Sequence, residues 1–228
     1  KKQQIAQMFD TISNEYDDLN RVISFGIDIK WRNKVVQIVA ETKPDNILDI
    51  ATGTGDLAIN LTRTNATQII GLDISEGMLE VGRKKILKKE LHKTIDMVVG
   101  DSENLPFDAD TFDAITVAFG VRNFENLEIG LAEIFRVLKP GGLFVVLETS
   151  VPTKFPFKQG YYLHNKIVLP LVGKLFSKDK VAYSYLSESA SKFPYGKAFN
   201  NILDKIGFTS SKAYPQTFGV ATIYTATK

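Results

Sequence analysis

The fold of this chain is decided by the stretch Leu48-Asp49-Ile50-Ala51-Thr52-Gly53-Thr54-Gly55-Asp56. It is predicted to be the end of a buried strand, a glycine-rich turn and the start of a helix. Gly53 and Gly55 can adopt backbone angles that other residues avoid, and they leave space for a ligand against the chain. The helix that follows offers free N–H groups and a positive dipole end to a carboxylate or phosphate. This turn, residues 51–55 and hereafter the glycine turn, is therefore expected to bind a dinucleotide or S-adenosylmethionine.

Length and composition indicate an ordinary globular protein. The 228 residues suffice for one large domain, or for one domain with a sizeable insertion. The net charge of +2 gives no support for a nucleic-acid partner, and the absence of cysteine excludes disulfides, thiol chemistry and thiolate metal sites. No apolar run approaches the ~20 residues that span a bilayer, and the N-terminus lacks the apolar core of a signal peptide. A cytoplasmic enzyme or binding protein is expected.

Short apolar strands alternate with amphipathic helices from Asn46 onward. Two closing strands have too few residues between them for a parallel crossover, so they should pair antiparallel. The pattern predicts an α/β fold: a Rossmann-like, seven-stranded, mostly parallel sheet with an antiparallel C-terminal hairpin. The predicted strands cover residues 46–50, 68–73, 96–99, 112–118, 143–149, 209–214 and 220–227. The predicted helices begin near Gly55, Ser75 (as N-cap), Leu127 and Phe199, and Lys139-Pro140-Gly141-Gly142 should end the third of them.

The chain is expected to form a single domain with four segments. These are N-terminal helices (1–45), a cofactor-binding core (46–150), a cap insertion (151–195), and a final helix with the antiparallel strands (196–228). The N-terminal helices should either cover the edge of the sheet or form a lid over the glycine turn. Residues 5–12 and 31–39 show helical spacing. Tyr16-Asp17-Asp18-Leu19-Asn20 and Ser24-Phe25-Gly26, which lie between these two helices, are predicted to form the break.

The glycine turn taken alone also fits a dinucleotide. Gly53-Thr54-Gly55-Asp56-Leu57-Ala58 satisfies G-x-G-x-x-G/A, and Asp73 follows at about the distance of a ribose contact. Two other acids weigh against NAD: Asp49 precedes the glycines and Asp101 follows the third strand. Carboxylates repel a pyrophosphate, but they suit a ligand that carries an ammonium and a sulfonium. This favours S-adenosylmethionine, with NAD as the alternative.

The block from Asn46 to Glu148 resembles the class I S-adenosylmethionine-dependent methyltransferases. The resemblance implies that Gly53, Thr54 and Gly55 hold the methionine part of the cofactor. It implies further that Asp73 binds the ribose hydroxyls and that Asp101 with Ser102 meets the adenine. Asp49, inside the first strand, is counted with them as a cofactor-binding residue because its carboxylate suits the cationic end of the cofactor.

Three further stretches are similar to the quinone-biosynthesis C-methyltransferases: Val117-Ala118-Phe119-Gly120-Val121-Arg122-Asn123-Phe124, Tyr16–Asn20 and Tyr183–Ser189. The resemblance implies methyl transfer from S-adenosylmethionine to a ring carbon of a polyprenylated quinol, with demethylmenaquinol as the favoured acceptor. C-methylation of a ubiquinol precursor, an NAD-dependent oxidoreductase and a catalytically idle module that binds a partner are the alternatives. Ala118 stands where some relatives have Ser, so it is not counted as a ligand.

Three residues are predicted to be catalytic. Arg122 and Asn123 follow the fourth strand at the edge where open α/β sheets bind ligands. Arg122 should stabilise the developing quinolate and Asn123 should orient the ring; the alternative is a turn cap and a solvent-exposed ion pair. Tyr16 should close over the cofactor or take part in proton transfer, with simple packing as the alternative. No metal is expected.

The cap insertion carries six lysines and one acid between Lys154 and Lys180, interleaved with aromatic and aliphatic residues. An ordinary cap that packs on the sheet is one interpretation. The other is peripheral contact with an anionic membrane surface, because basic residues beside apolar ones favour it and a prenylated substrate needs an apolar path. The expected location is the cytoplasm, at the inner face of the membrane where the cap docks.

Overall fold

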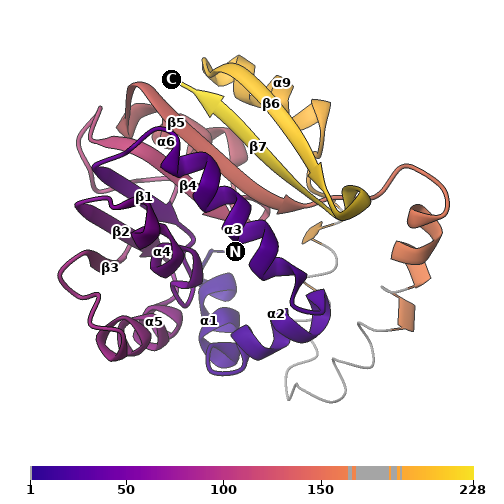
Figure 1. The fold of residues 1–228 in the computed structure, drawn as a ribbon, viewed down its shortest axis with the longest axis horizontal. Coiled ribbons are helices and arrows are strands. Elements are labelled where there is room, and N and C mark those ends of the chain that lie inside the picture. Colours follow the sequence, from indigo (N-terminus) through magenta and orange to yellow (C-terminus); the bar gives the residue numbers. More distant parts are fainter. Residues whose placement is uncertain (1, 164–165, 168–184, 186–188, 191) are drawn as a thin grey trace.

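The computed structural model describes residues 2–163, 166–167, 185, 189–190 and 192–228. These residues form one seven-stranded sheet in the order β3-β2-β1-β4-β5-β7-β6 (Figure 1). The strands are β1 (Asn46–Ile50), β2 (Gln68–Asp73), β3 (Ile95–Val99), β4 (Phe112–Ala118), β5 (Leu138–Thr149), β6 (Thr209–Gln216) and β7 (Ala221–Thr227). The helices are α1 (Lys2–Ile12), α2 (Tyr16–Ser24), α3 (Ile27–Ala40), α4 (Asp56–Leu61), α5 (Glu76–Lys88), α6 (Leu127–Val137) and α9 (Lys197–Ile206), with short 3₁₀ turns η1 (Thr62–Thr64), η2 (Val121–Asn123) and η3 (Thr217–Gly219).

The topology confirms the predicted fold class. Strands β1 to β5 are parallel to one another, and β7 runs antiparallel between β5 and β6. The predicted bounds of β1, β2 and β4 are those of the structure. Because parallel strands end at the same edge, the loops that follow β1, β2, β3 and β4 are gathered at one side of the sheet.

Two apolar cores cover the two faces of the sheet. Leu48 and Ile50 point into the core shared with α6 and α9, and Ile47 points into the core shared with α3, α4 and α5. Side chains alternate along a strand, so Asp49 lies on the α3–α4 face, as Ile47 does. Thr116, its register partner on β4, faces the same side. The sequence thus places a polar pair directly beneath the glycine turn.

The predicted helix break at residues 16–20 is wrong. Tyr16 begins α2, and the acids Asp17 and Asp18 lie in its first turn. Acids are stabilised there by the helix dipole, so a polar run that resembles a loop is the start of a helix. The second predicted break is confirmed, because Phe25 and Gly26 have φ values of 51° and 71° and separate α2 from α3.

The prediction for the end of α6 is confirmed, but β5 begins earlier than predicted. The helix ends at Val137 and the strand starts at Leu138. Leu138 pairs with Phe112, whereas Leu143 pairs with Ala114, so residues 139–142 form an irregularity within the strand. Gly141, with φ 77°, supplies the left-handed turn that this irregularity requires.

The N-terminal helices α1 and α2 lie beyond the carboxyl ends of the parallel strands, while α3 packs on the sheet (Figure 1). Of the cap, residues 157–163 are helical. Residues 164–165 and 168–184 of the predicted membrane-contact and substrate segment lie outside the described residues. In the described part of the chain, no helix has the length and apolar character to cross a membrane.

Candidate active site

The glycine turn has the backbone that its sequence predicts. Ala51, Gly53 and Gly55 have φ values of 52°, 57° and 78°, so the chain reverses sharply between β1 and α4. A Cβ atom at Gly53 would meet only the Cε1 atom of Tyr16, at 4.0 Å, so this position faces an open pocket. The backbone N–H of Gly53 donates a hydrogen bond to Asp73 Oδ2 (2.8 Å), which ties the turn to the end of β2.

Asp49 lies beneath the turn with both carboxylate oxygens hydrogen-bonded. The hydroxyls of Thr52 and Thr116 donate to Oδ2 and Oδ1, each at 2.6 Å. Burial raises the pKa of Asp49 to about 6, although both hydroxyls act in the opposite direction. This carboxyl therefore titrates near pH 6, and a neighbouring cation favours its ionised form.

A first pocket combines four of the predicted cofactor residues. Gly53, Asp73, Asp101 and Ser102 line it, and α1 covers it. Asp73 Oδ1 accepts from the backbone N–H of Ser75 (2.9 Å), and burial raises the pKa of Asp73. Asp101 accepts from Lys2 Nζ (2.7 Å) through Oδ2. We call this space the cofactor pocket.

The remaining predicted cofactor residues lie at the edge of this space. Asp49 and Thr54 line a small adjoining pocket that also includes Gly53. The Thr54 hydroxyl donates to Asp17 Oδ1 (2.6 Å) and accepts from Lys85 Nζ (3.0 Å), so it is already engaged. Gly55 lines neither pocket and provides the left-handed residue before α4.

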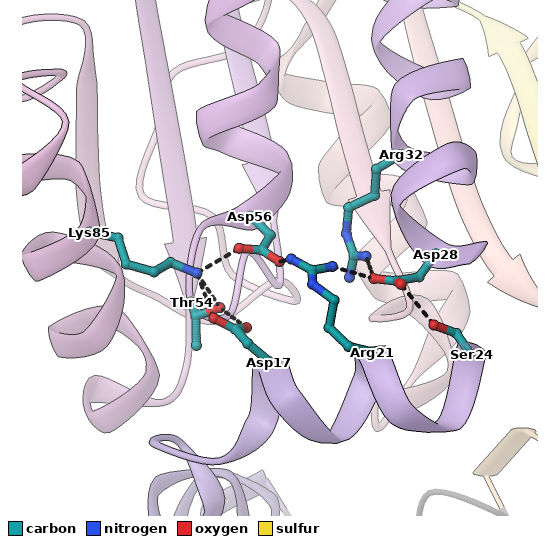
Figure 2. Close-up of polar contacts among 8 residues, drawn as sticks. All are labelled: Asp17, Arg21, Ser24, Asp28, Arg32, Thr54, Asp56 and Lys85. Atoms are coloured by element: carbon teal, nitrogen blue, oxygen red, sulfur yellow. Dashed lines mark hydrogen bonds and ion pairs between the residues drawn. The ribbon is translucent and has the colours of Figure 1, made fainter. Parts of the chain in front are cut away.

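A chain of alternating charges links the glycine turn to α2 and α3, as Figure 2 shows. Lys85 on α5 contacts Asp17 (2.7 Å) and Asp56 (2.6 Å), and Asp56 in turn contacts Arg21 (3.0 Å). Arg21 also donates to Asp28 (2.9 Å), which is paired with Arg32 and accepts from Ser24 Oγ (2.7 Å). We call Lys85, Asp17, Asp56, Arg21, Asp28 and Arg32 the charge chain. It holds α2 and α3 against α4 and α5.

A large apolar cavity of about 620 Å³ adjoins the cofactor pocket. Tyr16 and Phe119 line both spaces, so they form the wall between them. Burial raises the pKa of Tyr16, although the guanidinium groups of Arg122 and Arg32 act in the opposite direction. Tyr16 is therefore a protonated phenol at neutral pH, which is suited to donate a hydrogen bond and not to act as a base. We call this space the acceptor cavity.

Arg122 and Asn123 are neighbours in η2 but face different spaces. Arg122 lines the acceptor cavity, and Asn123 lines the cofactor pocket. The side chain of Arg122 is 7% exposed and forms an ion pair with the fully buried side chain of Glu148, so the alternative of a solvent-exposed ion pair is wrong. Burial alone would lower the pKa of Arg122, but Glu148 and nearby groups raise it. Within the described part of the chain, the Nε of Arg122 and the Oε2 of Glu148 are buried without a hydrogen-bond partner.

The sequence analysis missed several residues of this site. Arg32 appears in the sequence as a charged residue of an amphipathic helix, yet it is buried in the cavity wall. For Glu148, the sequence offers one indication of a functional role: it is a single acid at the end of an apolar strand. Tyr185 lies in a stretch that carried the resemblance, and its hydroxyl donates to Asn123 Oδ1 (3.2 Å).

The chemistry of the cofactor pocket favours a cationic cofactor over a pyrophosphate. Among the described residues that line it, the acids are Asp73, Asp101, Glu103 and Glu125, and the one basic side chain, Lys2, is paired with Asp101 and Glu103. Such a lining offers acceptors to hydroxyl and amino groups and repels phosphates. Together with a parallel sheet that ends in an antiparallel hairpin, it defines an S-adenosylmethionine-dependent methyltransferase.

Comparison with known proteins gives the family. Residues 1–228 match the model of the ubiE/COQ5 methyltransferase family, and the chain belongs to this family. It is 48% identical to a demethylmenaquinone methyltransferase of Bacteroides fragilis, over 100% of this chain and 94% of the relative. It is 42% identical to a ubiquinone/menaquinone biosynthesis C-methyltransferase UbiE of Geobacter sulfurreducens, over 100% of this chain and 90% of the relative.

The fold is also that of solved structures. A putative S-adenosyl-L-methionine-dependent methyltransferase from Methanococcus maripaludis superposes with a TM-score of 0.66 at 21% identity, over 96% of this chain and 93% of that chain. The predicted resemblance, the methyltransferase class and the cofactor S-adenosylmethionine are confirmed. The NAD-dependent alternative receives no support. The roles assigned to individual site residues stay predictions.

Proposed function

We propose that this chain transfers a methyl group from S-adenosylmethionine to a ring carbon of demethylmenaquinol and so produces menaquinol. The observation that carries the proposal is the apolar acceptor cavity, which meets the cofactor pocket at Tyr16 and Phe119. A prenylated ring needs such a cavity beside the methyl donor. The name of the relative from B. fragilis supports demethylmenaquinone chemistry. The name of the relative from G. sulfurreducens supports a ubiquinol precursor as the second candidate acceptor.

The main task of the protein in this reaction is placement. S-adenosylmethionine supplies a methyl group that its sulfonium has already activated. Tyr16 and Phe119, on the shared wall, would hold the ring in line with that group, which lowers the entropic part of the barrier. The ring carbon becomes nucleophilic as the neighbouring hydroxyl releases its proton to water, so the substrate is the reduced quinol. When the methyl group is transferred, S-adenosylhomocysteine leaves; the carbon then loses its own proton and the oxygen is reprotonated, which restores the aromatic ring.

The proposed roles of the catalytic residues follow from the spaces that they line. Arg122 stabilises the developing negative charge on the quinol oxygen, because its guanidinium lies in the cavity wall and is held by Glu148. Asn123, on the cofactor side and bonded to Tyr185, orients the ring at the boundary of the two spaces. Tyr16 closes over both ligands as a neutral phenol.

The proposed cofactor contacts follow from the same geometry. Asp73 binds the ribose hydroxyls, and Asp101 with Ser102 meets the adenine. Gly53 supplies the open backbone against which the methionine part lies, and Asp49 adds negative charge beneath it. Thr54 and Gly55 act by shaping the turn, since the Thr54 hydroxyl is bonded to Asp17.

We also propose peripheral contact with a membrane through the described start of the cap. Phe155 is 79% exposed, and Lys154 and Lys158 beside it are exposed as well. Phe157 follows, lines the acceptor cavity and stacks on Phe218 with ring centroids 3.8 Å apart. An exposed aromatic residue next to lysines suits an anionic lipid surface. Absence of co-sedimentation with anionic liposomes at low salt would contradict this contact.

One assay tests the proposed function. The protein is incubated with radiolabelled S-adenosylmethionine and, side by side, with reduced demethylmenaquinone and a demethoxyubiquinol-type precursor. Label in the organic extract of the first reaction supports the proposal, and label only in the second moves the assignment to the ubiquinol precursor. Cofactor binding by calorimetry without transfer to either quinol contradicts both and favours a catalytically idle module.

A further inference from the structure

Arg32 is a second buried cation, beside Arg122, in the mostly apolar wall of the acceptor cavity, and none of the roles proposed above uses it. It lies on α3, is 7% exposed, and lines the acceptor cavity. Its Cζ atom is 5.4 Å from the centroid of the Phe119 ring, which is part of the wall between the two spaces. Burial of a guanidinium beside an apolar cavity costs free energy unless its hydrogen-bonding capacity is used.

The ion pair with Asp28 engages only one end of the Arg32 guanidinium, its Nη1. Asp28 is 2% exposed and accepts from Ser24 Oγ at Oδ1 and from Arg21 at Oδ2. Each of its oxygens therefore has a donor besides Arg32. Arg21 is shared between Asp28 and Asp56, so Arg32 supplies the charge that balances Asp28. Figure 2 shows Arg32 at the end of the charge chain, with Asp28 between it and Arg21. The charge chain fixes where the guanidinium lies. Its Nη1 donates to Asp28, and Nε and Nη2 are the donors that another acceptor could meet.

Two guanidinium groups, from different elements, line the acceptor cavity. Arg122 comes from η2 and Arg32 from α3, and both line it. Both also act on the phenol of Tyr16, on which each exerts an electrostatic effect that opposes the effect of burial. Tyr16 thus lies near both cations. A ligand ring beside Tyr16 and Phe119 would have one cation at each of two positions around it.

We propose that Arg32 binds the second ring oxygen of the acceptor, the one across the ring from the hydroxyl next to the methylated carbon. Arg122 serves the first oxygen and Arg32 the second, so the site selects a 1,4-diol over a phenol with a single hydroxyl. This inference rests on the proposed function, because it assigns a specificity residue for the same acceptor. A polar anchor of this kind discriminates strongly against a ligand that lacks the matching group.

The test compares two ring ligands in one assay. The first is reduced demethylmenaquinone with a short prenyl chain, for which KM is measured. The second is a naphthol with the same prenyl group that keeps only the hydroxyl beside the methylated carbon, and its inhibition constant is measured against the first. In the wild type, we expect the diol to bind about 10- to 100-fold better than the mono-ol. In Arg32→Met, KM of the diol should rise until this preference is largely lost, while the inhibition constant of the mono-ol stays near its wild-type value.

Arg21→Met is the matched control. Arg21 contacts the same carboxylate, Asp28, but lies outside the lining of the cavity, so this variant should change the constants of both ligands together and keep their ratio. Arg32→Met with Asp28→Asn removes both charges and provides the same measurement if the single variant does not fold. The inference is overturned if a folded Arg32 variant still prefers the diol over the mono-ol as strongly as the wild type does. It is also overturned if Arg21→Met loses this preference as much as Arg32→Met does. A wild type that methylates no quinol overturns the proposed function itself.

Discussion

At the scale of single residues, the proposed role of Asp49 predicts that cofactor binding depends on pH. Its pKa of about 6 lies above the ordinary 3.8 because the carboxyl is buried. A cationic cofactor favours the ionised form, so binding below pH 6 must release a proton. Affinity for S-adenosylmethionine is therefore expected to fall by up to about tenfold per pH unit below that point. Calorimetry at pH 5.5 in two buffers of different ionisation enthalpy measures the proton release directly.

The same shift has a consequence for stability. The folded protein binds the Asp49 proton more tightly than the unfolded chain does. The protonated carboxyl therefore adds to the free energy of unfolding. This added stability is fully present below pH 3.8 and is lost as the pH rises through 6. Asp49→Asn should remove both this stability change and the proton release on binding. If the variant releases as many protons as the wild type, another acid, such as the buried Asp73, is the group that titrates.

Variants of Arg122 and Glu148 can separate the effect of this ion pair on stability from its effect on catalysis. Glu148→Gln leaves a buried guanidinium without its counter-charge, which is expected to cost about 3–5 kcal/mol of unfolding free energy. Arg122→Met combined with Glu148→Gln removes both charges and should regain most of that loss, yet turnover should stay far below that of the wild type. Urea unfolding and kcat are measured on the same samples. A double variant that is stable and fully active would remove Arg122 from the mechanism.

At the scale of elements, the charge chain holds α2 over the glycine turn. Lys85 on α5 reaches Asp17 on α2 and Asp56 on α4, and all three side chains are partly buried. Lys85→Met should cost about 1 kcal/mol of unfolding free energy and speed amide hydrogen exchange in α2, with α6 unchanged. Lys88→Met, on the same helix and outside the charge chain, is the control. Equal exchange in α2 for both variants would show that apolar packing alone holds this helix.

The elements differ in how far the sequence predicts them. Strands β1, β2 and β4 follow directly from short apolar runs, and the topology then places Gly53, Asp73 and Asp101 at one edge without further information. The start of α2 is not predictable in this way, because Asp17 and Asp18 suit a loop as well as a first helical turn. Asp17 contacts Thr54 of the glycine turn and Lys85 of α5, and both partners are distant in the sequence.

The same limit applies to the site. Arg32 and Glu148 are single charged residues in a helix and a strand, and no local pattern separates them from surface charges. Their burial and their contacts with Asp28 and Arg122 arise only from tertiary packing. The resemblance supplied Arg122 and Asn123 because they belong to a contiguous motif. It could not show that the two side chains face different spaces.

At the scale of the whole molecule, the two ligand spaces are built from common parts. Helix α1 covers the cofactor pocket with Ile5 and Phe9, and α2 carries Tyr16 into the wall of both spaces. Polar contacts hold α1 at two points, since Asp10 accepts from Ser75 Oγ (2.6 Å) and Lys2 donates to Asp101 (2.7 Å). A cofactor in the pocket would contact the inner face of α1 and thereby fix the position of Tyr16.

This arrangement predicts that cofactor and acceptor bind cooperatively. When the product cofactor S-adenosylhomocysteine fills its pocket, Tyr16 and Phe119 are ordered as the wall of the acceptor cavity, so a non-reactive quinol analogue should bind more tightly. Linkage requires the analogue to tighten binding of S-adenosylhomocysteine by the same factor, expected to be about 5- to 150-fold. Two calorimetric titrations, each with and without the other ligand, measure both factors. Tyr16→Ala should reduce the coupling in both directions, because it removes the shared wall. Equal affinities with and without the second ligand in the wild type would mean that the two spaces bind their ligands independently, and that Tyr16 separates them without connecting them.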